Sequence, residues 1–298
     1  MLNFISTKHS IEIIDQKEIY IFDDLGENID MTTVESFGEE WTAFNHFSEE
    51  EITKAGDQYF DIVKDEWIEG KTVLDVGCGT GRWSRYVSKK AQFVEAIDPS
   101  KAVYSAAKLL QNNMNVRISK AGVDTIPFAD STFDFVFSLG VLHHIPDTKA
   151  AMKKCVEKLK PNGYFLVYLY YNFEQRGLIF KSIFWLSSLL RFIVSKLPPS
   201  IKKLVCNIIA AFIYMPLIYI SKLVEALGMK SLSNMIPLSY YKTHSINIIF
   251  NDALDRFGTP LEQRFSREEI LEMMTSAGLK EIVFSKNEPY WHAIGQKA

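Results

Sequence analysis

The stretch Val73–Gly81 reads VLDVGCGTG and constrains the fold more than any other part of the chain. A short apolar run with one acid, Asp75, leads into Gly77, Gly79 and Gly81, and the residues after them can begin a helix. A strand that runs into a glycine loop and then a helix is how an open α/β sheet builds a nucleotide site. Glycine lets the backbone approach a ligand closely, because a Cβ would collide or forbid the needed dihedral angles. The start of the helix offers free N–H groups to an anion.

The spacing of the glycines separates two kinds of nucleotide site. A dinucleotide-binding loop runs Gly-x-Gly-x-x-Gly, but its third glycine would fall at Arg82. The pattern is instead Gly-x-Gly-x-Gly, with an acid two residues before the first glycine. This resembles motif I of the class I methyltransferases, which use S-adenosylmethionine (SAM). The resemblance implies that the loop, including Cys78, and the helix start hold the methionine part of SAM.

A second acid stands where the ribose of such a cofactor needs one. Residues 93–100 read FVEAIDPS, a predicted strand that ends at Asp98 and Pro99, and Asp98 lies 23 residues after Asp75. An acid about 20 residues past the glycine loop sits at the tip of the next strand and can accept hydrogen bonds from ribose hydroxyls. The alternative is a surface acid at a strand end, which the surrounding motif disfavours.

Two later stretches resemble the same family. Residues 122–128, GVDTIPF, resemble its adenine loop, although the family often has an acid where Gly122 stands; the backbone N–H of Val123 or the side chain of Asp124 could serve instead. Residues 131–147, STFDFVFSLGVLHHIPD, are similar to the ubiquinone/menaquinone-type enzymes, also called methyltransferase type 11. By that resemblance Leu139 lies beside the methionine part of SAM. The combined match covers about residues 71–170.

His143 and His144 follow Leu139 and are the candidate catalytic residues. Adjacent positions on a helix point about 100° apart, so the pair is a poor metal site, and we expect no metal. If the acceptor is a hydroxyl, its proton must leave, and a histidine titrates in a suitable range to accept it. The alternative is that both rings pack against the cofactor or cap the following helix.

Between Lys71 and Tyr170 predicted strands alternate with predicted helices, which favours a parallel α/β sheet. The resemblance implies a Rossmann-like, mostly parallel seven-stranded sheet with an antiparallel last strand, to which we add an α-helical insertion. The expected organisation is an N-terminal extension with a hairpin and a cap (1–48), a SAM-binding core (49–172), an apolar helical insertion that caps the acceptor site (173–262), and a last helix with two strands (263–298).

The N-terminal extension contains a possible hairpin at residues 11–22 and the stretch FGEEW at residues 37–41. FGEEW resembles a segment of methyltransferases from bacterial surface-glycan pathways. Such a segment closes over SAM in many class I enzymes, so Trp41 is a candidate ligand contact. The alternative is that the aromatic residues of this region pack a helix against the sheet.

The insertion contains two unusually apolar predicted helices, residues 178–194 and 201–227, and Pro216 should kink the second. Residues 204–221 are uncharged, which reaches the threshold length of a membrane span. We expect no span, because the last two strands must rejoin the same sheet. Two alternatives stay open: the pair only caps the acceptor pocket, completed by polar residues of 229–262, or it also lies on an anionic membrane, since residues 178–227 carry six basic residues and one acid.

Composition excludes several other classes. The net charge is −3 and no long basic run occurs, so nucleic acid is not an expected partner. Three distant cysteines predict neither disulfides nor a thiolate metal site, and we see no signal peptide, so a cytoplasmic protein is expected.

Together these features predict a SAM-dependent methyltransferase acting on a hydroxyl of a glycan or lipid-linked acceptor. The alternatives are a carbon methyltransferase on a prenylated quinone or another apolar ring, and a non-catalytic SAM-binding protein.

Overall fold

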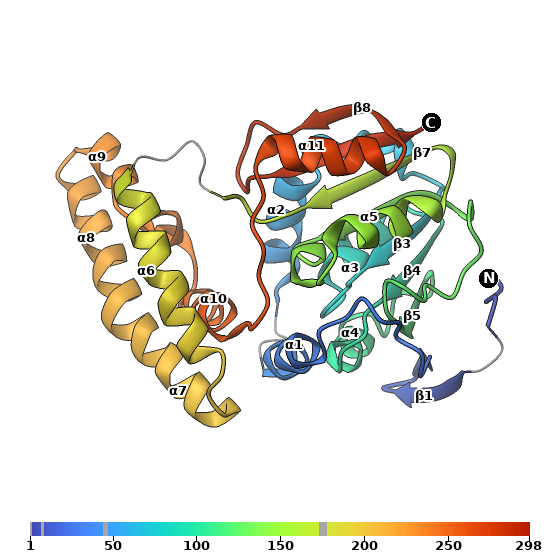
Figure 1. Cartoon of the computed structure of the whole chain (residues 1–298), viewed down its shortest axis with the longest axis horizontal. Helices are drawn as coiled ribbons and strands as arrows, with labels where there is room; N and C mark the ends of the chain where they lie inside the picture. The colour runs from blue at the N-terminus through green and yellow to red at the C-terminus, as the bar shows by residue number, and fades with distance from the viewer. Residues whose placement is uncertain (1, 7–8, 44–46, 173–177) are drawn as a thin grey trace. The chain divides into compact units, whose positions relative to one another are not determined.

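The computed structural model describes residues 2–6, 9–43, 47–172 and 178–298, and the chain forms two compact units (Figure 1). Unit 1 comprises Met1–Gln175 and Leu261–Ala298, and unit 2 comprises Arg176–Pro260. Unit 2 therefore falls within the range 173–262 that the apolar pattern marks as an insertion, and the chain leaves and re-enters unit 1 around it.

Unit 1 is built on one sheet whose strands, among the described residues, follow the order β1-β2-β5-β4-β3-β6-β7-β9-β8. The central strands pair in parallel, whereas β9 is antiparallel to both β7 and β8. The mostly parallel sheet with an antiparallel last strand is thus confirmed. The strands are β1 (Ser10–Ile14), β2 (Lys17–Ile21), β3 (Thr72–Val76), β4 (Phe93–Ile97), β5 (Val116–Lys120), β6 (Phe133–Leu139), β7 (Leu159–Tyr168), β8 (Leu279–Phe284) and β9 (His292–Lys297).

Within the described ranges the sheet has nine strands where the family resemblance implies seven, and the predicted N-terminal hairpin supplies the other two. β1 and β2 form that hairpin, and β2 continues the sheet by pairing in parallel with β5. The reason lies in the pattern of β2, in which Ile19 and Ile21 alternate with more exposed residues and face the core. A strand with one apolar face is stabilised when it extends an existing sheet over a helix layer.

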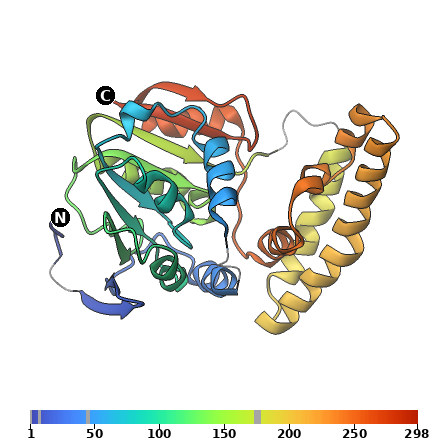
Figure 2. The ribbon, with the colours of Figure 1, turned by 180° about the vertical axis from the view of Figure 1, so that it is seen from behind.

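Helices cover both faces of the sheet (Figures 1 and 2). Along β6, Phe135 and Phe137 join the core beneath α3 and α4, whereas Phe133 and Val136 join the core beneath α5 and α11. Phe135, Val136 and Phe137 alternate with the period of two expected of a strand buried on both faces, whereas the irregularity between Phe133 and Phe135 returns Phe133 to the face of Val136. The helices of unit 1 are α1 (Met31–Ala43), α2 (Glu49–Tyr59), α3 (Arg82–Ser88), α4 (Ala102–Leu109), α5 (Thr148–Glu157) and α11 (Arg267–Ser276), with short 3₁₀ turns at Asp65–Trp67 and Leu142–His144.

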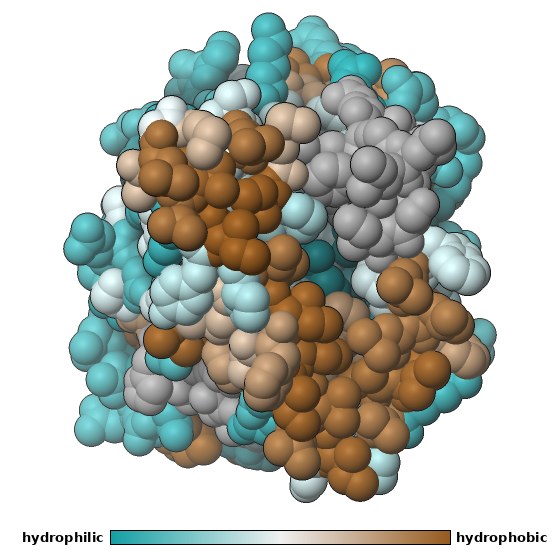
Figure 3. Space-filling view, turned by 90° about the vertical axis from the view of Figure 1, so that its left-hand side faces the viewer, coloured by the Kyte–Doolittle hydropathy of each residue, from teal (hydrophilic) through white to brown (hydrophobic). Residues whose placement is uncertain are grey.

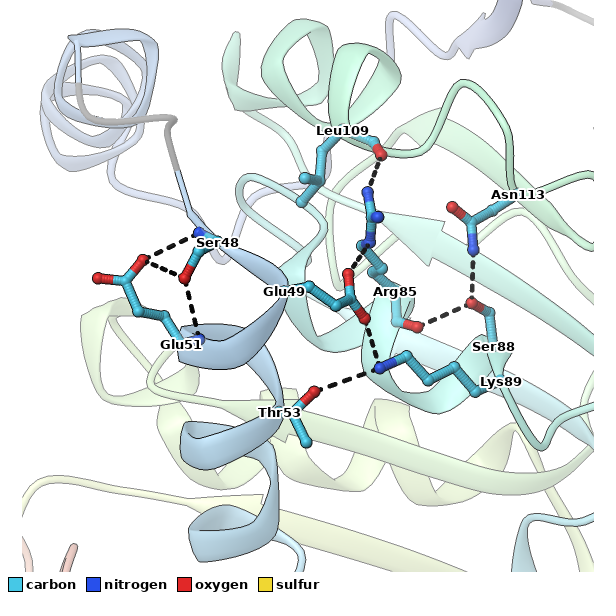
Figure 4. A network of polar contacts seen from close by, with 9 residues as sticks. All are labelled: Ser48, Glu49, Glu51, Thr53, Arg85, Ser88, Lys89, Leu109 and Asn113. Carbon is cyan, nitrogen blue, oxygen red and sulfur yellow. Dashed lines mark hydrogen bonds and ion pairs between the residues drawn. The ribbon is translucent and has the colours of Figure 1, made fainter.

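Helix α2 is fastened to α3, the helix that follows the glycine loop (Figure 4). Its first turn begins with a capping box, in which Ser48 accepts from the Glu51 N–H and Glu51 returns a bond to the Ser48 N–H. Glu49 pairs with Arg85, at 2.8 Å between carboxylate and Nε, and with Lys89. The contact holds α2 beside the helix whose start forms part of the candidate site.

Unit 2 is helical, and the two predicted apolar helices are confirmed in it. The first is α6, and the second runs through α7 and α8 with one turn of π-helix, Ala210–Tyr214, between them. This wide turn comes just before Pro216 and is the irregularity expected there, since proline lacks the N–H that a regular turn uses. The helices are α6 (Leu178–Val194), α7 (Pro199–Ile209), α8 (Met215–Ala226), α9 (Lys230–Met235) and α10 (Ile246–Gly258), with a 3₁₀ turn at Ser239–Thr243.

Candidate cofactor and active site

The glycine loop joins β3 to α3 and is held against the end of β4. The backbone N–H groups of Gly77 and Cys78 both donate to the carbonyl oxygen of Ile97, at 2.8 and 2.9 Å. The Gly81 N–H donates back to the Cys78 carbonyl at 2.8 Å, which closes the turn just before the helix. The loop is therefore a rigid structure at the carboxyl edge of the parallel strands, where open α/β sheets bind their ligands.

The three glycines serve two different purposes. All have positive φ, which disfavours other residues. A Cβ on Gly77 would lie 2.4 Å from the side chain of Val141, and one on Gly81 would lie 2.6 Å from Leu110. A Cβ on Gly79 would meet nothing nearer than the Trp41 indole at 3.9 Å. Only Gly79 thus has open space above its backbone, while the other two permit close packing of the protein itself.

Asp75 lies at the end of β3 with a carboxylate that the protein satisfies only in part. The side chain is 1% exposed, and Oδ2 accepts a 2.6 Å hydrogen bond from Ser84. Among the described residues Oδ1 has no hydrogen-bond partner. Burial, with a smaller contribution from the charge of Asp98, raises the pKa of Asp75 to about 7, against the lowering effect of the Ser84 hydrogen bond. The charge of Arg82 lowers the pKa, but Oδ1 still calls for a hydrogen-bond donor that the described part of the protein does not provide.

Asp98 follows β4 and bonds directly to the loop. Its Oδ2 accepts the Gly79 N–H at 3.0 Å, and its Oδ1 accepts from the Ser100 N–H and hydroxyl at 2.8 and 2.6 Å. Burial raises its pKa, while the bonds from Ser100 and Gly79 work in the opposite direction. Oδ1 thus accepts two hydrogen bonds, whereas Oδ2 accepts only one and keeps a lone pair for a ligand hydroxyl. Pro99, which follows it, is half-buried.

The predicted adenine loop is covered by the segment between β2 and α1. A Cβ on Gly122 would lie 2.2 Å from the carbonyl oxygen of Leu25, so the acid that the family often has there cannot fit beside this segment. Asp124 is also engaged by the segment, since its Oδ2 accepts from the Asn28 N–H at 2.7 Å. The remaining predicted contacts of this loop are the N–H of the buried Val123 and the second oxygen of Asp124.

The two candidate catalytic histidines differ in their partners. The ring of His143 is fully buried, packs against Tyr170 in a tilted arrangement with 3.8 Å between ring centroids, and has no hydrogen-bond partner at either nitrogen among the described residues. Burial and the neighbouring His144 hold its pKa well below the usual range. His144 instead places Nδ1 2.7 Å from the carbonyl oxygen of Leu261. A carbonyl only accepts, so Nδ1 carries the proton, and in the neutral ring Nε2 carries the lone pair.

Helix α1 brings two aromatic side chains over the site. Phe37 contacts His144, with 4.7 Å between ring centroids, and Trp41 lies at the open face of Gly79. Residues four apart lie on one face of a helix, so the FGEEW stretch can reach both the candidate base and the loop. Gly38, between them, allows α1 to approach the backbone of Lys101.

The connections to unit 2 contain contacts that the sequence does not reveal. Leu261 and Gln263 follow the insertion, and the Gln263 N–H donates to the His143 carbonyl at 2.9 Å. The Gln263 side chain bonds the Ile145 carbonyl at 2.7 Å. Tyr170, just before the insertion begins, packs its ring against that of His143. Aromatic residues at the end of β7 are a weak signal for such a site, and a carbonyl such as that of Leu261 provides none.

A further histidine, His292 at the start of β9, also has specific partners. Its ring bonds the carboxylate of Asp61 at 2.8 Å and the carbonyl of Pro289 at 2.7 Å. Burial alone would raise the pKa of Asp61, but hydrogen bonds from His292, Ser285 and Asn287 bring it below its ordinary value. The pair fastens the loop before β9 to the residues that follow α2.

The arrangement fits SAM. Its positively charged ammonium and sulfonium groups match the unsatisfied buried carboxylate of Asp75, and the open face of Gly79 leaves room for a ligand beside the loop. The described residues contain no cluster of three or more His, Cys, Asp or Glu side chains that could hold a metal ion. The predicted contact Leu139 is the last residue of β6 and is buried next to this edge of the sheet.

Comparison with known proteins gives a consistent result. Residues 74–167 match the model of a family described as "Methyltransferase domain". The chain is similar to a ubiquinone biosynthesis O-methyltransferase of Alkalilimnicola ehrlichii (35% identity, 33% of this chain, 40% of the relative). It is also similar to a tRNA U34 carboxymethyltransferase of Nautilia profundicola (36% identity, 32% of this chain, 33% of the relative). A solved SAM-dependent methyltransferase from Aquifex aeolicus aligns with 18% identity and a TM-score of 0.43, over 84% of this chain and 98% of that one.

Proposed function

We propose that this chain, whose residues 74–167 belong to the class I, type 11 family of methyltransferase domains, transfers a methyl group from SAM to a hydroxyl of a glycan or lipid-linked acceptor. The matched segment spans about two fifths of the relatives from ubiquinone biosynthesis, and unit 2 lies outside it. One observation carries the proposal. Two buried carboxylates, Asp75 and Asp98, lie at the ends of two paired strands, and Asp98 bonds the open glycine Gly79, on the same edge of the sheet as a histidine with a defined tautomer.

SAM supplies an activated methyl group on a positively charged sulfur, so the protein has mainly to hold donor and acceptor in line. Such positioning can supply about 7–11 kcal/mol of the barrier. Asp75 would attract the positive charge, because its ionised form is stabilised by a cation in a buried site. Asp98 would orient the remainder of the cofactor through the free lone pair of Oδ2, and Trp41 would cover the open face of Gly79 and exclude water.

His144 is the residue that we propose as the general base. Its Nδ1–H is directed at the Leu261 carbonyl, which stabilises the ring when Nε2 takes a proton from the acceptor hydroxyl. His143 is less suited, because burial disfavours its protonated form. We propose that His143 packs with Tyr170 and supports the position of His144.

The acceptor is proposed as a glycan or lipid-linked molecule on account of the FGEEW stretch and the apolar unit 2. The similarity to an O-methyltransferase of ubiquinone biosynthesis supports transfer to oxygen. A prenylated quinone or other apolar ring, methylated at carbon, stays the second candidate. A non-catalytic SAM-binding protein is the third. We propose that the protein works in the cytoplasm, at the inner face of the membrane if the acceptor is lipid-linked.

The cofactor assignment can be tested by calorimetry with SAM and, in parallel, with NADH. We expect saturable binding of SAM alone. Binding of NADH without SAM would overturn the assignment of the glycine loop.

The acceptor and the base can be tested together with SAM carrying a labelled methyl group. Lipid extracts, soluble glycans and quinone precursors are offered as three separate acceptor classes. For the accepted class, His144→Gln should lower kcat by about 10²–10⁴ without changing the affinity for SAM. His143→Gln is the matched variant, and a larger kcat loss in it than in His144→Gln would reverse the two assignments.

A further inference from the structure

Unit 2 exposes large apolar side chains along its helices. Figure 3 shows hydrophobic side chains gathered into broad patches over the helices of this unit. Phe212 is 77% exposed and Trp185 is 69% exposed, whereas a soluble monomer usually exposes large apolar residues singly. We name this set the outer apolar face; its members are Trp185, Leu189 and Phe192 of α6, and Ile201, Leu204, Ile208, Phe212, Tyr219, Leu223 and Leu227 along the α7–α8 run.

The outer apolar face is separate from the hydrophobic core of unit 2, which lies on the opposite side of the same helices. Cys206, Ile209 and Ile218 are buried there against α10. Tyr214 donates a 3.0 Å hydrogen bond to Asp252, and Tyr241 bonds the other oxygen of that carboxylate. The α7–α8 run is therefore apolar on two faces, and its internal contacts determine which face stays outward.

Charge is divided unequally between the two units. Unit 2 contains ten basic and three acidic residues, a net charge of +7, in a chain whose total is −3. Unit 1 therefore carries −10. On unit 2, Lys196, Lys203 and Lys222 are exposed beside the outer apolar face. The ammonium of Lys196 lies 3.6 Å from the centroid of the Phe192 ring. Basic groups at the margin of an apolar face are the arrangement that suits an anionic bilayer surface.

The same helices are better suited to lie on a membrane than to cross it. Among the described residues one helical run, Ser200–Ala226, is long and apolar enough to span a membrane, and 33% of its most apolar window is buried. Crossing would expose the Tyr214–Asp252 pair to hydrocarbon, which is costly for a charged carboxylate. Both ends of unit 2 also join one sheet, because β7 before the insertion pairs with β9 after it. A single crossing would separate these two strands.

We propose that unit 2 is a docking module that lays its outer apolar face on an anionic lipid surface. RNA would be attracted by the same positive charge, but it offers little to the large apolar residues between the lysines. The inference rests on the proposed function in one respect: a lipid-linked acceptor would be held in the same bilayer. Docking would then bring unit 1 to its substrate and restrict the search for it to two dimensions.

Vesicle flotation of the full chain tests the proposal directly. We expect at least tenfold more protein to float with phosphatidylcholine vesicles that contain phosphatidylglycerol than with phosphatidylcholine alone, and added salt should reduce the difference. Phe212→Gln with Leu223→Gln should lower flotation at least tenfold. The matched control is Met114→Gln with Ile13→Gln, which changes residues of unit 1 that are 85% and 66% exposed and should have no effect.

Charge reversal provides a second, independent test. Lys203→Glu and Lys222→Glu should each lower binding to anionic vesicles about fivefold, whereas Lys64→Glu in unit 1 should not. Circular dichroism of each variant checks that unit 2 stays folded. Calorimetry with SAM checks unit 1, so failure of membrane binding is distinguished from failure of the proposed function. Equal flotation of both glutamine double variants would overturn the proposal. The proposal would also be overturned if the protein self-associated in the absence of vesicles and Phe212→Gln abolished that association. Tighter binding to tRNA than to anionic vesicles would overturn it as well.

Discussion

The two units of this chain depart in opposite ways from the usual arrangement, in which charged side chains are exposed and large apolar side chains are buried. Around the glycine loop unit 1 buries carboxylates, with Asp75 1% exposed and Asp98 8% exposed. Unit 2 exposes apolar side chains such as Phe212, at 77%. Burying a charge without a full set of partners and leaving a large apolar face in water both cost free energy. The comparison teaches that each unit suits a different partner: the buried carboxylates of unit 1 suit a cationic ligand, and the exposed face of unit 2 suits the anionic lipid surface proposed above.

The largest expected effect comes from Gly77→Ala in the loop. The new Cβ would lie 2.4 Å from Val141 at a φ of +80°, so the loop must shift, and we expect at least a 100-fold loss of SAM affinity in calorimetry. Gly228→Ala in unit 2 is the matched control, because its φ is +83° and a Cβ there meets nothing within 4 Å. Gly228→Ala should lower the free energy of unfolding by only the strain of positive φ, about 1–2 kcal/mol, and leave SAM affinity unchanged. Similar SAM affinities in the two variants would show that the loop geometry is not what binds the cofactor.

The buried carboxylate of unit 1 should show in the pH dependence of stability. With a pKa of about 7 when folded and 3.8 ordinarily, Asp75 keeps its proton in the folded state and loses it in the unfolded state between these values. The folded state thus binds more protons, so the free energy of unfolding falls as pH rises from about 4 to about 7, by up to about 1.4 kcal/mol per pH unit.

Asp75→Asn should remove this fall in the free energy of unfolding with rising pH, measured by denaturant unfolding of the ligand-free protein. It should also weaken SAM binding tenfold or more. In the unsubstituted protein SAM affinity should rise with pH toward 7, since a cation favours the ionised carboxylate. Ser84→Ala removes a hydrogen bond that favours the ionised form of Asp75 and should raise its pKa in the folded state. The pH range over which the free energy of unfolding falls should then extend to higher pH. An unchanged slope in Asp75→Asn would contradict the assignment.

A smaller effect is expected inside unit 2. Tyr214→Phe removes the hydroxyl that donates to Asp252, and a hydrogen bond to a charged group contributes about 1.5–3 kcal/mol. Thermal unfolding should therefore shift to lower temperature, while SAM affinity stays unchanged. Tyr219→Phe, at an exposed tyrosine of the outer apolar face, should leave stability unchanged. A change in SAM affinity for Tyr214→Phe would mean that the two units are energetically coupled.

The smallest effect is expected at the exposed polar network of Figure 4. Glu49→Gln breaks the pairs with Arg85 and Lys89, which are all partly exposed, so the loss should be at most about 1 kcal/mol. The effect should disappear in 1 M salt, where exposed charges are screened. Glu50→Gln, at the next residue of the helix, is the control. If Glu49→Gln lowered the free energy of unfolding much more than Glu50→Gln at high salt, Glu49 would have a packing role.

Much of unit 1 could be predicted because its signals are local. Short apolar runs marked the strands, and the hairpin predicted within residues 11–22 is confirmed. The capping box between Ser266 and Glu269 at the start of α11 is a local signal of the same kind. The extension of the sheet to nine strands was not predicted, because pairing of β2 with β5 joins residues far apart in the chain. For the same reason the covering of Gly122 by Leu25 has no signature in either segment alone.

The sequence by itself identified the binding site for the methyl donor. The spacing of Gly77, Gly79 and Gly81 and the acid at Asp98 are properties of short segments, and short segments suffice to define a loop between a strand and a helix. Only the tertiary structure decided which glycine faces open space, which nitrogen of His144 carries the proton, and which face of the α7–α8 run stays outward. Each of these depends on an atom supplied from a distant part of the chain, such as the Leu261 carbonyl or the Asp252 carboxylate, and long-range contacts of that kind leave no periodic trace in sequence.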